Sequence, residues 1–155
     1  MNQQPNDIFC IYQCLAAFLK AQECFVNLRD EIQEKTNHFD MYKNRLIKYN
    51  FGLHGAEVEN KSDGIYLVAG LEATRDDKEE VYWSVSITVT TEKIIVEGII
   101  TVSDENDPET IYWTVHKPVF TRIEHTSDPM QAASYILQFA QEVCAQSDFM
   151  NSPRS

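Results

Sequence analysis

Glycine, proline and cysteine are all scarce in this sequence, which contains five, five and four of them among its 155 residues. Such a composition excludes collagen-like, low-complexity and disulfide-scaffold proteins. Hydrophobic residues make up 43% of the chain, and a chain of this length buries enough surface to fold without disulfides or metal. We therefore expect one domain that spans residues 1–155.

Short catalytic and metal-binding motifs are also lacking. The sequence contains no HExxH, GxSxG, P-loop or GxGxxG pattern, and its four histidines do not show metal-ligand spacing. The apolar run at residues 8–19 is too short to span a bilayer, and no basic residue precedes it as in a signal peptide. We predict a cytoplasmic protein that is not an enzyme and binds no metal or cofactor.

The cysteines do not form a recognisable redox or metal motif. Cys10, Cys14 and Cys24 lie in one apolar stretch, and Cys144 lies far away in the sequence. On a helix, Cys10 and Cys14 share one face, where buried thiols behave as small hydrophobic groups. We interpret them as reduced core residues.

Two segments show the spacing of helices. Residues 7–50 are expected to be helical, as one bent helix or as two, and residues 129–147 as a C-terminal helix. The first segment carries an apolar stripe, and its second part repeats aromatic and aliphatic residues through Phe39, Tyr42, Leu46 and Tyr49. Asp128 is the expected N-cap of the C-terminal helix, with Pro129 in its first turn and Gln131 at the capping-box position. The predicted N-terminal stripe consists of Ile8, Ile11, Leu15, Phe18, Phe25 and Ile32.

Between these segments the apolar period changes to two, which is typical of half-buried strands. We expect a four-stranded antiparallel meander over residues 65–121, with strands at 65–74, 81–90, 94–102 and 111–121. The predicted fold is thus α+β, with the C-terminal helix packed on one sheet face and a polar tail at 148–155. Trp83 and Trp113 should face the helices, and hydroxyl-bearing residues should line the opposite face.

Charge of one sign is concentrated in the second part of the chain. Residues 1–50 carry six basic and six acidic side chains, whereas residues 51–155 carry seven basic and eighteen acidic ones. The net charge of −11 therefore arises entirely after residue 50. A chain this acidic repels nucleic-acid phosphates and anionic lipids, which argues against both as partners.

Two connections between predicted strands are especially acidic. The first cluster is Asp76, Asp77, Glu79 and Glu80, and the second is Asp104, Glu105, Asp107 and Glu109. In a meander these connections lie at the same end of the sheet, about 10 Å apart, which is close to the Debye length of about 8 Å at physiological salt. We expect them to form one negative patch that attracts a basic protein.

Two other interpretations of the acidic clusters remain open. Acidic turns can simply keep strand ends solvated. Calcium binding is a further alternative because Asp104, Asp107 and Glu109 offer carboxylate oxygens, although the twelve-residue loop with its glycine is missing.

Aromatic residues and a histidine complete the predicted contact surface. Tyr82 and Tyr112 each precede a tryptophan, so they should lie on the face opposite to it, where they supply contact area. His116 is expected on the same face and is the best candidate for a general acid or base, should the chain have weak enzymatic activity.

The leading hypothesis is a small acidic module that masks or holds a basic protein partner. Bacterial immunity proteins and secretion chaperones are analogous in charge and size, not in sequence. The alternative is a small-molecule-binding domain with a pocket between sheet and helices, lined by Trp83, Trp113, Phe18, Phe25 and Tyr42. A homodimer that uses a strand edge or the N-terminal helix is a third possibility.

Overall fold

A computed structural model describes residues 7–36, 39–40, 45–46, 49–61, 64–75, 79–104 and 116–146. The order of elements is α1 (Asp7–Thr36), β1 (Phe39–Asp40), β2 (Arg45–Leu46), β3 (Tyr49–Lys61), β4 (Gly64–Arg75), β5 (Glu79–Val89), β6 (Ile94–Asp104), β7 (His116–Thr126) and α2 (Pro129–Cys144). The predicted α+β arrangement of N-terminal helix, antiparallel sheet and C-terminal helix is confirmed.

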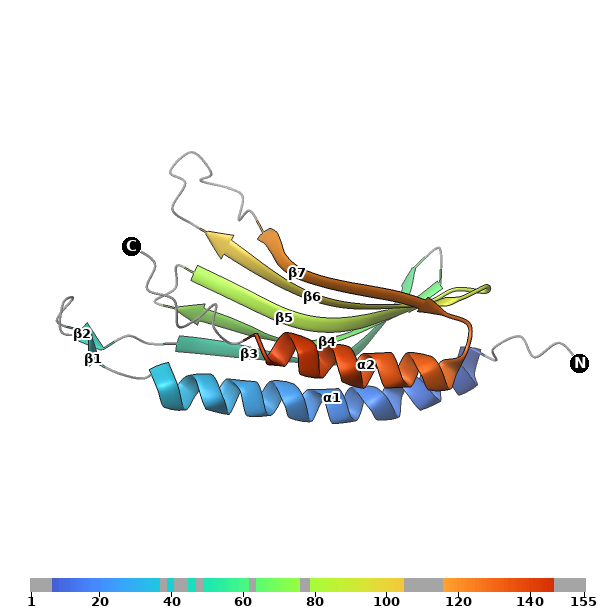
Figure 1. The fold of residues 1–155 in the computed structure, drawn as a ribbon, viewed down its shortest axis with the longest axis horizontal. Helices are drawn as coiled ribbons and strands as arrows, with labels where there is room; N and C mark the ends of the chain where they lie inside the picture. Colours follow the sequence, from blue (N-terminus) through green and yellow to red (C-terminus); the bar gives the residue numbers. More distant parts are fainter. Residues whose placement is uncertain are drawn as a thin grey trace, which may run out of the picture.

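The main sheet is an antiparallel meander with strand order β3-β4-β5-β6-β7. It has five strands and not the four that we expected. Both helices lie on the same side of this sheet, and β5 and β6 bow so that their hollow side is turned away from the helices (Figure 1). Among the described residues, no helix combines the length and apolar character needed to cross a membrane.

The additional strand is β3, and it replaces part of the predicted second helix. The prediction of helix through Phe39 to Tyr49 was wrong: Phe39 pairs with Leu46 in a short two-stranded sheet, and Tyr49 begins β3. Tyr42 lies outside the described residues. Four apolar residues at helical spacing are also compatible with the observed order, in which the short pair β1–β2 is followed by β3. In β3, Gly52 and Gly55 concealed the alternation of Tyr49, Phe51 and Leu53. α1 is therefore one helix that ends at Thr36.

The last strand lies further along the chain than predicted. β7 covers His116–Thr126, so the residues from 122 to 126 that we expected in a connection pair with β6. Residues 111–115 lie outside the described residues. β7 is an edge strand, and side chains on both of its faces are exposed, including Thr121, Arg122 and Ile123. This exposure removes the alternation by which strands are recognised.

The core lies between the sheet and the helices. On β5, Val81, Trp83, Val85, Ile87 and Val89 are all buried, as their alternation predicts. The Trp83 indole Nε1–H donates to the carbonyl of Gln146, 3.1 Å away, just beyond α2. Trp83 therefore faces the helices as predicted, whereas Trp113 lies outside the described residues.

The buried stripe of α1 differs from the predicted one. Phe18, Phe25 and Ile32 are buried, but Leu15 is 36% exposed. The side chains of Ile8 and Ile11 lie outside the described set. The inner seam of α1 follows alternating steps of four and three residues, as in coiled-coil packing. It consists of Cys14, Phe18, Ala21, Phe25, Leu28 and Ile32.

The start of α2 follows its sequence signals with one difference. Asp128 is the N-cap and accepts the backbone N–H of Met130 at 3.1 Å, with Pro129 in the first turn. Gln131 does not complete a capping box with Asp128. Its Oε1 accepts the Thr126 hydroxyl at 2.7 Å, and Thr126 Oγ1 in turn accepts the Asp128 N–H. The helix ends at Cys144, and the predicted tail at 148–155 lies outside the described residues.

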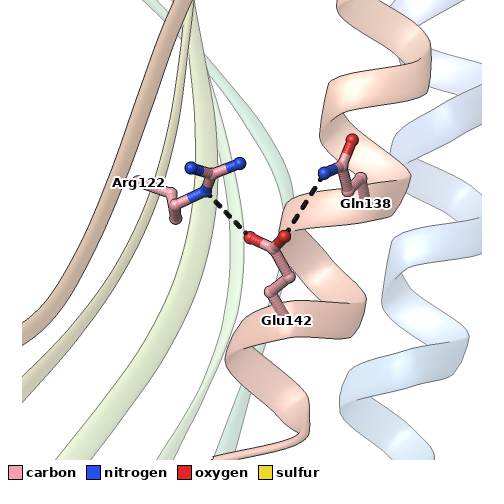
Figure 2. A network of polar contacts seen from close by, with 3 residues as sticks. All are labelled: Arg122, Gln138 and Glu142. Atoms are coloured by element: carbon pink, nitrogen blue, oxygen red, sulfur yellow. Dashed lines mark hydrogen bonds and ion pairs between the residues drawn. The ribbon is translucent and has the colours of Figure 1, made fainter.

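Polar contacts join α2 to the edge strand β7. The Arg122 guanidinium donates through Nε to Glu142 at 3.1 Å, and the Gln138 amide donates to the other oxygen of the same carboxylate (Figure 2). Arg122 also lies over the Phe139 ring, 5.3 Å from its centroid. These contacts are partly solvated, so each contributes little free energy, but together they orient β7 against the helix.

Gly98 sets the distance between α2 and β6. A Cβ at this position would lie 3.0 Å from Phe139 Cβ and 3.3 Å from Val143 Cγ1. Both distances are tighter than most Cβ contacts, so a larger residue at this position would displace Phe139 or Val143 by a few tenths of an ångström. The close packing of α2 on β6 therefore favours glycine here.

We expect Gly98→Val to lower the free energy of unfolding by about 1–3 kcal/mol, because the added methyl groups overpack the contact with Phe139 and Val143. Urea denaturation followed by tryptophan fluorescence measures this change. Thr101→Val on the opposite face of β6 is the control and should change stability by less than about 0.5 kcal/mol. Equal stability of Gly98→Val and the wild type would contradict this view of the α2–β6 contact.

Candidate functional site

The acidic connections leave the sheet from neighbouring strand ends. Glu79 at the start of β5 and Asp104 at the end of β6 are Cα partners, and Arg75 at the end of β4 pairs with Glu79 from the other side. The connections after β4 and after β6 therefore start at the same end of the sheet. Arg75 contributes a basic residue at this end.

Most of the predicted contact residues lie where their side chains are not described. Residues 76–78 and 105–115 lie outside the described residues, and so do the side chains of Glu79, Asp104 and His116. The positions of their charges stay a prediction. The predicted residues concerned are Asp76, Asp77, Glu79, Asp104, Glu105, Asp107, Glu109, Tyr112 and His116. Glu80 and Tyr82 are the two whose side chains are described, and both are half-buried.

Tyr82 belongs to a cluster on the sheet face turned away from the helices. Its ring meets the His54 ring of β3 edge-on, with centroids 5.5 Å apart and planes at 78°. The His54 Nε2 lies 3.2 Å from Glu72 Oε2 on β4. Gly70 of β4 lies between His54 and Ser84 in the register, and a Cβ there would lie 3.1 Å from Tyr82 Cζ. Gly70 thus provides the space in which residues of β3 and β5 meet.

This cluster brings together three titratable side chains that the sequence did not connect. His54 and Glu72 were missed because they lie eighteen positions apart, and only the β3–β4 register makes them diagonal neighbours. Their contact, together with Tyr82, ties the edge strand β3 to β4 and, across β4, to β5. Ser84 and Ser86, which we predicted on this open face, are buried by their neighbours at 3% and 8% exposure.

A pocket of about 250 Å³ lies between α1 and β3. It is lined by Gln22, Phe25, Val26, Leu53, His54 and Gly55. Of the three predicted lining residues that the structure describes, it shares only Phe25, since Trp83 and Phe18 are fully buried in the core. Gly55 permits the close approach of the two elements, because a Cβ there would lie 2.8 Å from Gln22 Nε2.

Large apolar side chains are also exposed on the two elements that line this pocket. Tyr12, Leu15 and Leu19 of α1 are 74%, 36% and 57% exposed, and Leu53 of β3 is 41% exposed. Together with Gln22 and Val26, the three α1 residues recur at steps of three and four positions and form a second stripe along the helix. We call this set, Tyr12, Leu15, Leu19, Gln22 and Val26, the outer stripe.

The described cysteines lie within the helical layer and are not joined in disulfides. Cys14 is buried, and Cys24 of α1 and Cys144 of α2 are partly buried. Burial raises the pKa of Cys24, and the nearby Glu23 adds to this shift. Burial raises the pKa of Cys144 more strongly, with smaller contributions from Cys24 and Glu31. Both thiols are therefore weak nucleophiles at neutral pH, and no cluster of three metal-ligating side chains occurs within the described part of the chain.

Comparison with protein-family models, curated proteins and solved structures found no match. The function therefore has to be argued from the surface of the molecule.

We expect Cys24 and Cys144 to react slowly with iodoacetamide at pH 8 in the folded protein, because burial keeps both thiols protonated. Mass spectrometry of the digested protein measures the labelling of each cysteine. The same protein in urea is the control, and both sites should then label at the rate of a free thiol. Rapid labelling of Cys144 without urea would show that the contact between the two helices opens.

Proposed function

We propose that this protein is a cytoplasmic binding module that holds a basic protein partner and has no catalytic role. The observation that carries the proposal is the outer stripe of α1, which exposes large apolar side chains next to an apolar pocket. Exposed apolar side chains that lie singly are ordinary, whereas a contiguous group beside a pocket is typical of an interaction site. Burial of Leu15 and Leu19 by a partner removes apolar surface from water, which favours association against the cost of ordering the two molecules.

The charge of the chain indicates the kind of partner. A net charge of −11 attracts basic proteins and repels acidic ones. The two acidic connections begin at the same end of the sheet, so their fields add if their side chains stay near the strand ends. Such a field raises the association rate more than the final affinity. We therefore assign encounter with the partner to the acidic end and retention of the partner to the apolar flank.

The pocket favours a protein side chain over a small molecule as its occupant. Sites for drug-sized ligands measure about 300–1,000 Å³, and this pocket of about 250 Å³ lies below that range. The pocket shares Gln22 and Val26 with the exposed outer stripe. A small metabolite enclosed in the pocket would leave the rest of this stripe uncovered.

The first test replaces the apolar flank. We expect Leu15→Glu with Leu19→Glu to abolish retention of specific basic proteins from a native lysate, because both changes place charge where the partner buries apolar surface. Quantitative mass spectrometry of the bound fraction measures this loss. Met130→Glu is the matched control, because it replaces another highly exposed apolar residue, 70% exposed, on the other helix. Equal retention by both variants would refute the proposal.

The second test reverses charge at the acidic end. Replacing Asp104, Glu105 and Asp107 by Lys should lower the association rate of a captured partner by about tenfold at low salt, and the difference should shrink as salt is added. Surface plasmon resonance at two salt concentrations measures both rates. An unchanged association rate would show that these residues only keep the strand ends solvated.

A further inference from the structure

The outer stripe repeats the pattern of the seam that α1 already buries. Its steps of three and four residues match those of the inner seam, and at 3.6 residues per turn the two are separated by about 115° around the helix axis. The inner seam packs on α2 and on the sheet. A helix with two such seams can pack against one helix on each seam. In α1 the inner seam already packs on α2, and the outer stripe could receive a third helix.

The helical layer leaves room for a third helix next to α1. α2 packs on β5, β6 and β7, whereas α1 packs on β4 and on the edge strand β3. The outer stripe lies on the β3 side of α1, because Gln22 and Val26 line the pocket together with Leu53, His54 and Gly55. A third helix placed there would cover the pocket and the exposed Leu53.

Acidic side chains lie along the solvent side of the outer stripe. They indicate which residues a docked helix would carry beside its apolar face. Glu23 follows Leu19 by four positions and Asp30 follows Val26 by four, so each is the next neighbour along the helix surface. Glu34 continues this acidic ridge, and all three are exposed. Two basic residues lie nearby: Lys20, which is exposed three positions before Glu23, and Arg29, whose guanidinium is paired with Asp30 at 3.3 Å.

We infer that the outer stripe, with the pocket at its end, is a docking site for an amphipathic helix of the partner that carries Lys or Arg beside its apolar seam. This inference rests on the proposed function and specifies the recognised segment. One large apolar side chain of the helix fills the pocket above Leu53, and its basic residues lie beside Glu23 and Glu34. A second copy of this chain is a poor occupant, because it would bring Glu23 and Glu34 of one molecule close to the same carboxylates of the other.

The probe is a synthetic helix of about 20 residues, long enough to be helical in water, with leucines in a heptad seam and lysines beside it. Fluorescence anisotropy at physiological salt measures its binding to the whole protein. We expect binding that Leu15→Glu with Leu19→Glu weakens by about tenfold or more. Met130→Glu should bind the probe as the wild type does.

Three comparisons separate the docking of a helix from other outcomes. A peptide of the same composition with the seam scrambled should bind weakly, and so should one with glutamate in place of lysine. Equal binding of the scrambled peptide would overturn the inference in favour of charge alone. Sedimentation of the protein by itself that shows a dimer lost in Leu19→Glu would overturn it in favour of a second copy.

The experiment also distinguishes this inference from the function that it rests on. If the lysate partner is retained through Leu15 and Leu19 but the helical probe does not bind, the partner uses another kind of segment and the binding function stands. If neither is retained, both are refuted. Circular dichroism of each variant shows that its helices remain folded.

Discussion

The close contact of α2 with the middle of β6 determines the arrangement of the other elements. Because Gly98 has no side chain, Phe139 and Val143 reach the strand directly, and α2 occupies the space over β5, β6 and β7. α1 then packs beside α2 and covers β3 and β4. The two helices together pack on all five strands, and the helical layer ends at the flank of α1 beside the edge strand β3.

The same arrangement separates two kinds of interaction in space and in range. The acidic connections extend from the end of the sheet where Glu79 and Asp104 are paired, and their field acts over about a Debye length of 8 Å. The outer stripe acts only at contact, through the surface that it buries. Under the proposed function, a partner is attracted by the acidic end before it is oriented by contact with the outer stripe, which lies on the continuous helix α1.

Much of the fold could be predicted from the sequence, and the failures have physical causes. The alternation around Trp83 and the signals Asp128 and Pro129 identified β5 and the start of α2, because local geometry alone decides them. β3 was missed because Gly52 and Gly55 break its pattern for reasons that lie in other elements: Gly55 makes room for Gln22 of α1. β7 was misplaced because an edge strand has no fully buried face.

The candidate site was harder to predict because it consists of apolar side chains of α1 that are not packed against other elements. The apolar residues of α1 fall on two stripes, and Leu15 was assigned to the core since hydropathy does not distinguish a seam that meets α2 from one that meets solvent. Likewise, His54 and Glu72 meet only through the register of β3 with β4. The tyrosine at position 82 was predicted on the open face from alternation, but its histidine neighbour was not.

The exposed stripe also explains why the strong negative charge is useful to the molecule. A helix with two apolar seams tends to associate with copies of itself, and nothing in the stripe of Tyr12, Leu15 and Leu19 prevents this. Charge repulsion between chains of −11 opposes self-association without covering the stripe. The same charge does not oppose a basic partner. Under the proposed function, the negative charge therefore disfavours a second copy of the chain and favours a basic partner.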